Sequence, residues 1–159
     1  MYLGLDLGTT NVKAVLVDQA GRAVCAGATA IGCVHGPGGS AEQDIEEIWR
    51  ATCEAIRQAL GGEGEAPATR EEGMPSPRRR APLAVGVSSQ GGAIQLLDRA
   101  ESPLGPVISW LDSRGRLYDD AITRRLGAEF FSDRLGHGSS GVAVGQILRL
   151  REATPGLLA

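Results

Sequence analysis

The chain has 159 residues, of which 42% are hydrophobic and 22% charged, and its formal net charge is −3. This composition is typical of a single globular domain, and a mildly acidic chain is a poor candidate for a general nucleic-acid or membrane-surface binder. No apolar run approaches the roughly 20 residues that span a bilayer, and no signal-peptide pattern opens the chain. The three cysteines, Cys25, Cys33 and Cys53, lack CxxC spacing. Reduced thiols in a cytoplasmic protein are therefore expected, rather than disulfides or a zinc site.

The first thirty residues predict an antiparallel meander of strands. Apolar and polar residues alternate with period two, and Val and Leu are frequent among them, which is typical of half-buried strands. Asp18 to Gly21 supply a turn, with glycine where a positive φ is favoured. The expected strands are residues 2–7, 11–18 and 22–31.

A helix is predicted after a loop at 32–40 that is rich in glycine. Ser40 has Gln43 three residues later, which is the spacing of a capping box at a helix N-terminus. Apolar residues then recur at helical spacing from about 42 to 60. This helix is expected to be amphipathic, with Trp49 in the core.

The rest of the chain predicts further strands and helices, so an α/β protein is expected. Residues 61–82 are rich in Pro, Gly and charge, and they predict an exposed loop of low complexity. Residues 83–89 form a continuous apolar run, typical of a buried strand. Asp112 is expected to cap a helix that extends to about Arg125. Other strands are expected at 93–98 and 107–110, and other helices at 127–135 and 143–152.

The turn between the first two predicted strands and the residues beside it contain more polar and charged side chains than a turn requires. These residues are, in order, Asp6, Gly8, Thr9, Thr10 and Lys13. Backbone N–H groups and Thr hydroxyls can converge on a phosphate, Asp6 can organise Mg²⁺ through its water shell, and Lys13 can neutralise a transferring phosphoryl group. A plain hairpin with a solvated turn is the alternative. The pattern GxxxxGK[ST] does not occur, which excludes P-loop NTPases.

A second group of polar and aromatic residues follows two of the later predicted strands. Glycines after a buried strand let a ligand approach the backbone, and an indole, a carboxylate and a guanidinium suit a polyhydroxylated ligand. The alternative is that Trp110 is a core residue and that Asp112 and Arg114 form a helix cap with a surface pair. The candidates are Gln90, Gly91, Gly92, Trp110, Asp112 and Arg114.

Two other patterns look chemical but have structural interpretations. Residues 136–141, GHGSSG, match the dinucleotide pattern GxGxxG. The segment before them looks helical, and the chain ends before the acidic residue that this fingerprint needs. A flexible loop is therefore favoured, with a sugar-contacting loop or the NAD site of an oxidoreductase as alternatives. His35 has no Cys or Asp partner at ligand spacing and is expected to be solvated.

Four segments of the chain occur in an order and spacing that are typical of one enzyme family. They are LGLDLGTTNVKAVLVD, EQDIEEIW, AVGVSSQGG with AIQLLD, and PLGPVISWLDSR. Together they resemble the N-terminal domain of the FGGY carbohydrate kinases, which include xylulokinase, gluconokinase and glycerol kinase. The resemblance covers nearly the whole chain and implies an actin-like, ribonuclease-H-like α/β domain.

The resemblance also implies a function, the transfer of the γ-phosphoryl group of ATP to a sugar or polyol hydroxyl with Mg²⁺. In this family ATP and sugar lie in a cleft between two such domains. The resemblance implies no nucleic-acid or membrane partner, and it is compatible with a homo-oligomer of the intact enzyme. The resemblance assigns Asp6 to the metal or its water, and Lys13 to charge neutralisation. It assigns the turn of Gly8, Thr9 and Thr10 to the phosphates. Substrate contact is assigned to Gln90, Gly91 and Gly92, and the W-x-D-x-R segment corresponds to Trp110, Asp112 and Arg114.

The chain departs from the family in its substrate loop and in its extent. Gly91 and Gly92 stand where xylulokinases carry Met-His and near where glycerol kinases carry Arg-Glu, so neither substrate is assigned. In the family the general base is an aspartate later in the N-terminal domain, and the adenine site lies in a C-terminal domain. Residues 1–159 are therefore interpreted as a partial N-terminal domain without a catalytic residue of its own. A non-catalytic remnant with at most weak ligand binding is the alternative.

Overall fold

The computed structural model describes residues 1–61 and 81–157. The predicted loop at 61–82 thus lies almost entirely outside the described residues. Contacts divide the chain into two units, which are described separately here. The first comprises Met1–Cys33 and Asp44–Gln90, and the second comprises Val34–Gln43 and Gly91–Ala159.

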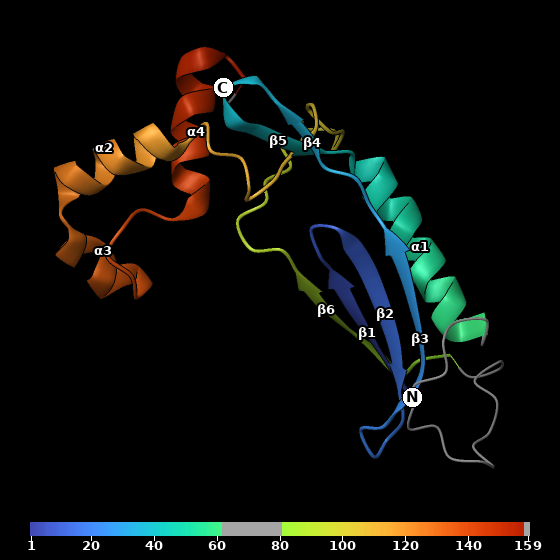
Figure 1. The fold of residues 1–159 in the computed structure, drawn as a ribbon. Coiled ribbons are helices and arrows are strands. Elements are labelled where there is room, and N and C mark those ends of the chain that lie inside the picture. The colour runs from blue at the N-terminus through green and yellow to red at the C-terminus, as the bar shows by residue number, and fades with distance from the viewer. Residues whose placement is uncertain (62–80, 158–159) are drawn as a thin grey trace. The chain divides into compact units, whose positions relative to one another are not determined.

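The first unit is a four-stranded mixed sheet with one helix, and Figure 1 shows its strands side by side. The strand order is β3-β2-β1-β6, with β1 antiparallel to β2 and parallel to β6. The predicted meander is confirmed, because β2 also pairs with β3 in antiparallel fashion. The elements are β1 (Tyr2–Leu7), β2 (Asn11–Val17), β3 (Ala23–Ala30), β6 (Ala84–Ser89) and α1 (Ile45–Gly61).

Helix α1 packs against β2 and β3 through small side chains. Ala51, Ala55 and Ala59 are buried against Val12 and Ala14 of β2, within the main apolar cluster of this unit. Alanines allow a helix to approach a sheet closely, and burial of this cluster supplies the hydrophobic stabilisation of the unit. The face of β2 and β3 that α1 covers is therefore apolar, and the alternate side chains point to the opposite face.

Helix α1 begins differently from the prediction. The carboxylate of Asp44 accepts a hydrogen bond from the N–H of Glu46 at 2.9 Å, so Asp44 satisfies one of the free N–H groups of the first turn. Ser40 and Gln43 instead belong to a strand, β5 (Ser40–Gln43), and the predicted capping box is wrong. Trp49 is 63% exposed, so its predicted place in the core is also wrong.

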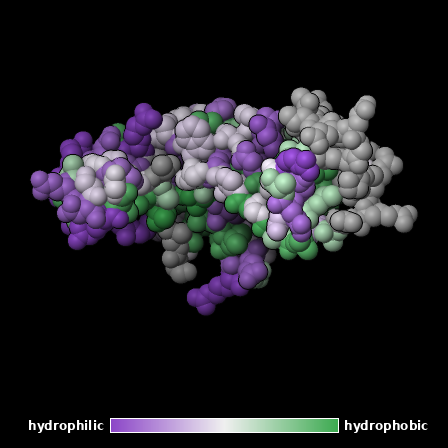
Figure 2. Space-filling view, turned by 90° about the horizontal axis from the view of Figure 1, so that it is seen from below, coloured by the Kyte–Doolittle hydropathy of each residue, from purple (hydrophilic) through white to green (hydrophobic). Residues whose placement is uncertain are grey.

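Strand β6 begins one residue after the predicted start at 83 and ends as predicted at Ser89, but it is not buried as predicted. Val85 is 53% and Val87 is 63% exposed, although both have the apolar character of a buried strand. Helix α1 packs on β2 and β3, and within the described residues β6 packs mainly against its neighbour β1. The space-filling view shows hydrophobic residues, in green, at the molecular surface (Figure 2).

The second unit joins a small sheet to helices. Strand β4 (Val34–Gly36) pairs with β5, which pairs with β7 (Val107–Ile108), so part of the predicted loop at 32–40 is strand. The predicted strand at 93–98 is wrong, since that segment forms only isolated bridges at Ile94 and Leu97. The N–H of Asp98 donates to the carbonyl of Ser102 at 2.9 Å, so a tight turn closes the bridge between Leu97 and Pro103.

Three helices follow in the second unit, as predicted. They are α2 (Arg116–Leu126), α3 (Ala128–Leu135) and α4 (Val142–Ala153). Helix α2 has Gly115 at its N-cap position and no side-chain cap, so the predicted cap by Asp112 is wrong. Among the helices that the structure describes, none combines the length and the apolar character needed to cross a bilayer.

The close approach of α1 to β3 predicts a sharp difference between two glycines of the sheet. A Cβ at Gly27 would lie 2.6 Å from the Cβ of Gln58 in α1, whereas a Cβ at Gly86 of β6 would meet no atom within 4 Å. We expect Gly27→Ala to lower the free energy of unfolding by about 1–3 kcal/mol, because the helix must shift. Gly86→Ala is the matched control and is expected to change it little. Urea unfolding followed by circular dichroism measures both, and equal losses would contradict this account of the packing.

Candidate functional site

The turn between β1 and β2 is tight, and its glycine is required. The N–H of Gly8 donates to the carbonyl of Asn11 at 3.1 Å. A Cβ at Gly8 would lie 2.8 Å from the same carbonyl oxygen, so any larger residue would open the turn. The carbonyl of Thr10 accepts a hydrogen bond from the N–H of Ile31 at 3.0 Å. The turn is thus held from within and from the end of β3.

Asp6 and Lys13 are brought together by the pairing of β1 with β2. Their Cα atoms are direct cross-strand partners, so both side chains point to the same face of the sheet, the face opposite α1. Both are exposed. They border a hollow of about 820 Å³ whose floor includes the small residues Gly4, Ala26 and Ala28. The predicted phosphate residues therefore lie at an open, accessible surface with one negative and one positive group.

The structure also connects the turn to one of the predicted substrate residues. The hydroxyl of Thr9 donates to the side-chain carbonyl of Gln90 at 3.2 Å, and the N–H of Gln90 donates to the carbonyl of Leu7 at 3.0 Å. Gln90 thus lies beside the turn, at the end of the neighbouring strand. The chain then passes through Gly91 and Gly92 into the second unit, and Gly92 has a φ of 81°, a conformation that favours glycine.

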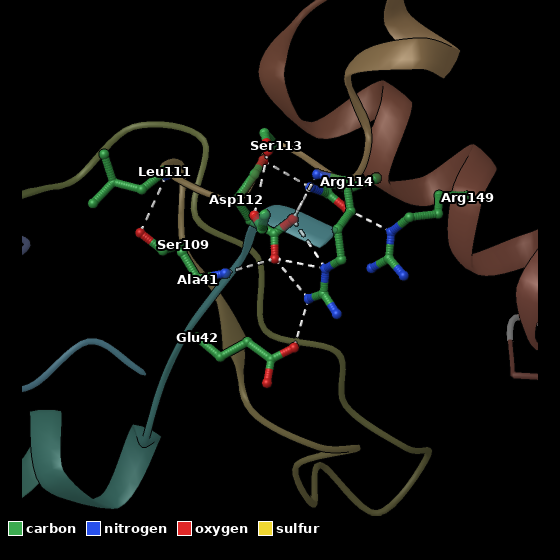
Figure 3. Close-up of polar contacts among 10 residues, drawn as sticks. Ala41, Glu42, Ser109, Leu111, Asp112, Ser113, Arg114 and Arg149 are labelled. Atoms are coloured by element: carbon green, nitrogen blue, oxygen red, sulfur yellow. Dashed lines mark hydrogen bonds and ion pairs between the residues drawn. The ribbon is translucent and has the colours of Figure 1, made fainter. Parts of the chain in front are cut away.

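Asp112 lies at the centre of a hydrogen-bond network in the second unit (Figure 3). Its carboxylate accepts bonds from the N–H of Ala41 at 3.1 Å and from the amide of Gln146 at 2.9 Å. The guanidinium of Arg114 donates to it from Nε at 2.9 Å and from Nη2 at 2.6 Å. The same guanidinium donates to the carboxylate of Glu42 at 2.5 Å. The network joins β5, the segment after β7, and α4.

These contacts govern the charge of Asp112. Burial by itself raises the pKa of this carboxyl, but hydrogen bonds from the Arg114 guanidinium, the N–H groups of Ala41 and Arg114, and Gln146 outweigh it and lower the pKa to about 2. The hydrogen bond with Asp112 raises the pKa of Arg114 above its ordinary value. The Asp112 side chain has no exposed surface, with a relative exposure of 0%. We infer that Asp112 and Arg114 position the segment that carries Trp110.

Trp110 itself is 47% exposed, so the alternative that it is a core residue is wrong. It lies on the rim of a second hollow, of about 500 Å³, which is lined also by residues of α2 such as Asp119 and Thr123. An indole exposed beside a hollow can pack against an apolar ligand face. Contact between Trp110 and a ligand stays a prediction.

The GHGSSG segment is a loop and His35 is exposed, as the sequence predicted. Gly136 ends α3 and Gly141 precedes α4, so the pattern lies between two helices and lacks the strand of a dinucleotide fingerprint. Ser140 is 7% exposed, and its N–H donates to the hydroxyl of Thr123 at 3.0 Å. His35 is exposed in β4. Within residues 1–61 and 81–157, no three His, Cys, Asp or Glu side chains gather as metal ligands would.

Sequence reasoning missed three residues that the fold brings to these places. Glu42 and Gln146 complete the network around Asp112, and Ser88 of β6 is the cross-strand partner of Asp6 on the other side of β1. Each arises from a contact between distant parts of the chain, for which local periodicity gives no signal. For Ser88 the sequence did contain one indication, because it lies near the end of a predicted strand, two residues before Gln90.

The lowered pKa of Asp112 predicts a pH-dependent contribution to stability. The native carboxylate has a pKa of about 2 against an ordinary 3.8, so it stabilises the fold above about pH 4, and this contribution is lost as the pH falls towards 2. We expect Asp112→Asn to lower the free energy of unfolding at neutral pH by about 2 kcal/mol. The difference between wild type and variant should shrink on acidification. Urea unfolding across this pH range measures it, with the exposed Asp120→Asn as control. A difference that is constant with pH would contradict the assignment.

Comparisons with known proteins identify the family of the chain. The N-terminal domain of the FGGY family of carbohydrate kinases matches residues 1–158. Apulose kinase of Pectobacterium atrosepticum is 32% identical over 86% of this chain and 25% of its own length. Xylulose kinase of Escherichia coli is 32% identical over 72% of this chain and 21% of its own length.

Solved structures show the same fold. A xyloylose kinase from Brucella ovis superposes with a TM-score of 0.81 at 25% identity, over 98% of this chain and 29% of that one. Gluconate kinase from Lactobacillus acidophilus superposes with a TM-score of 0.79 at 21% identity, over 98% and 29%. The predicted actin-like α/β fold is thereby confirmed. The chain spans about a quarter of the length of the curated relatives it matches, and it belongs to the FGGY family of carbohydrate kinases.

Proposed function

We propose that this chain is a partial N-terminal domain of an enzyme that transfers the γ-phosphoryl group of ATP to a hydroxyl of a sugar or polyol. Within that enzyme it would supply the residues that face the ATP phosphates. The observation that carries the proposal is the Asp6–Lys13 pair, which lies on one open face of the sheet beside the Gly-Thr-Thr turn. Family membership supports it, because the relatives named above are sugar kinases.

The residues at the turn fit a nucleotide with Mg²⁺. Mg²⁺ prefers oxygen ligands, keeps several waters, and is commonly bound through one carboxylate and the substrate phosphates. Asp6 offers such a carboxylate, and no cage of further acidic residues surrounds it in the described chain. When bound, the ion would neutralise charge on the transferring group. Lys13 would add a positive charge beside it, and the Gly8, Thr9 and Thr10 turn would present hydroxyl and N–H donors to the phosphates.

The sugar would be held by the second group of residues. Gln90, Gly91 and Gly92 would contact it, and the exposed ring of Trp110 would pack on its C–H face. Asp112 and Arg114 would act by holding the segment of Trp110 in place. In such enzymes catalysis is largely positioning and electrostatic stabilisation of the transferring phosphoryl group.

We assign the general base and the adenine site to regions outside residues 1–159. The limited coverage of the relatives supports this division. The free thiols of Cys25, Cys33 and Cys53 support a cytoplasmic location, because such compartments keep thiols reduced. The exposed apolar side chains of β6 favour the alternative, a non-catalytic remnant, and a chimera separates the two.

The division of roles predicts that the 159-residue chain alone gives no sugar-dependent formation of ADP. A coupled assay with ATP, Mg²⁺ and a panel of ketopentoses, gluconate and glycerol measures it. Measurable turnover by the purified chain would show that the general base lies within it.

A chimera tests whether the phosphate residues are functional. We expect this chain, put in place of the matching segment of apulose kinase, to support phosphorylation of apulose, and Lys13→Met to lower kcat by about 100-fold or more through lost charge stabilisation. Arg22→Met, in the turn between β2 and β3 and thus away from the Gly-Thr-Thr turn, is the control and should act like the parent chimera. A folded but inactive chimera would favour the remnant, and an unchanged kcat in Lys13→Met would contradict the role of Lys13.

A further inference from the structure

We propose that Ser88 is a further residue of the phosphate site, where its hydroxyl binds a Mg²⁺–nucleotide together with Asp6 and Lys13. This inference rests on the proposed function and adds to it a residue that neither the turn motif nor the predicted substrate loop contains.

The pairing of three strands carries the inference. Asp6 of β1 has Lys13 of β2 as its partner on one side and Ser88 of β6 as its partner on the other. Neighbouring strands lie about 4.8 Å apart, and in-register residues point to the same face. Lys13, Asp6 and Ser88 therefore form a row across the sheet, on the face opposite α1. Asp6 is the middle member.

The three side chains of this row are available for a ligand. All three are exposed, and within the described residues none of them takes part in a hydrogen bond or ion pair. An Asp and a Lys that are direct cross-strand partners commonly attract each other, yet here they do not close an ion pair. In the next row along the sheet Gly4 pairs with Gly86. A Cβ at Gly86 would meet no atom within 4 Å, so the space beside Ser88 is open, whereas a Cβ at Gly4 would lie 3.0 Å from the side chain of Val15.

The chemistry of the row matches a phosphate with its cation. Asp6 supplies a negative group for the hydrated cation, and Lys13 supplies a positive group for phosphate oxygens. The Ser88 hydroxyl both donates and accepts, so it can donate to a phosphate oxygen or accept from a water that Asp6 holds. Ser89 cannot substitute for it, because it pairs with Leu7 and points to the opposite face.

The adjacent serines provide a matched test. The probe is Mg²⁺–ATP, titrated into the complete chain and followed by two-dimensional NMR, with adenosine as the control that lacks phosphates. We expect Ser88→Ala to weaken binding by about tenfold, because a hydrogen bond to a charged group is lost. Ser88→Thr keeps the hydroxyl and should restore affinity to within about threefold. Ser89→Ala should change affinity by less than about twofold, and thermal unfolding checks that all variants fold.

The outcomes separate this inference from the proposed function. If Lys13→Met weakens binding while Ser88→Ala behaves like Ser89→Ala, the role of Ser88 is wrong and the phosphate site stands. If Ser88→Thr binds as weakly as Ser88→Ala, the hydroxyl is not the binding group. If millimolar Mg²⁺–ATP shifts no resonance of the wild-type chain, the role of Ser88 in this chain is wrong, whereas the proposed function, which places the adenine site outside residues 1–159, is decided by the chimera. If Lys13→Met binds as well as wild type, the assignment of Lys13 to the phosphate site is wrong, and the role of Ser88 is wrong with it.

Discussion

Strand β1 is hydrogen-bonded along both edges, antiparallel to β2 and parallel to β6, and the candidate site depends on this double register. A shift of one residue in either pairing would move every side chain of a strand to the other face. Helix α1 fixes the choice, because its alanines bury Val12 and Ala14 of β2. Lys13 must then point away from the helix, beside Asp6, at the open face.

A second constraint is the buried carboxylate of Asp112. An ionised group without exposed surface is stable only when hydrogen bonds replace its water, and here Arg114, Gln146 and the N–H of Ala41 do so. This requirement ties two distant segments of the second unit together. It also changes the meaning of the W-x-D-x-R pattern, since the Asp and Arg serve as internal anchors while Trp110 remains exposed.

The failed predictions share a physical reason. Periodicity tells which residues share a face, but it does not tell whether another element covers that face. Trp49 was expected to be buried from its place in the helical spacing and Val87 from its place in a continuous apolar run, and both are exposed in the described chain. The capping box at Ser40 had the correct spacing, but pairing with β4 and β7 draws that residue's segment into a sheet. Long-range pairing thus overrode a local preference.

The sequence by itself determined the meander, the helices and the polar turn of Asp6 to Lys13, because local residue spacing indicates each of them. It also determined the family, because the order of the motifs is typical of that family. Tertiary structure decided what those residues can touch. It set Ser88 beside Asp6, enclosed Asp112, and left Trp110 exposed. The reason is that strand register and burial are formed by contacts between segments far apart in the chain, and a local pattern does not contain them.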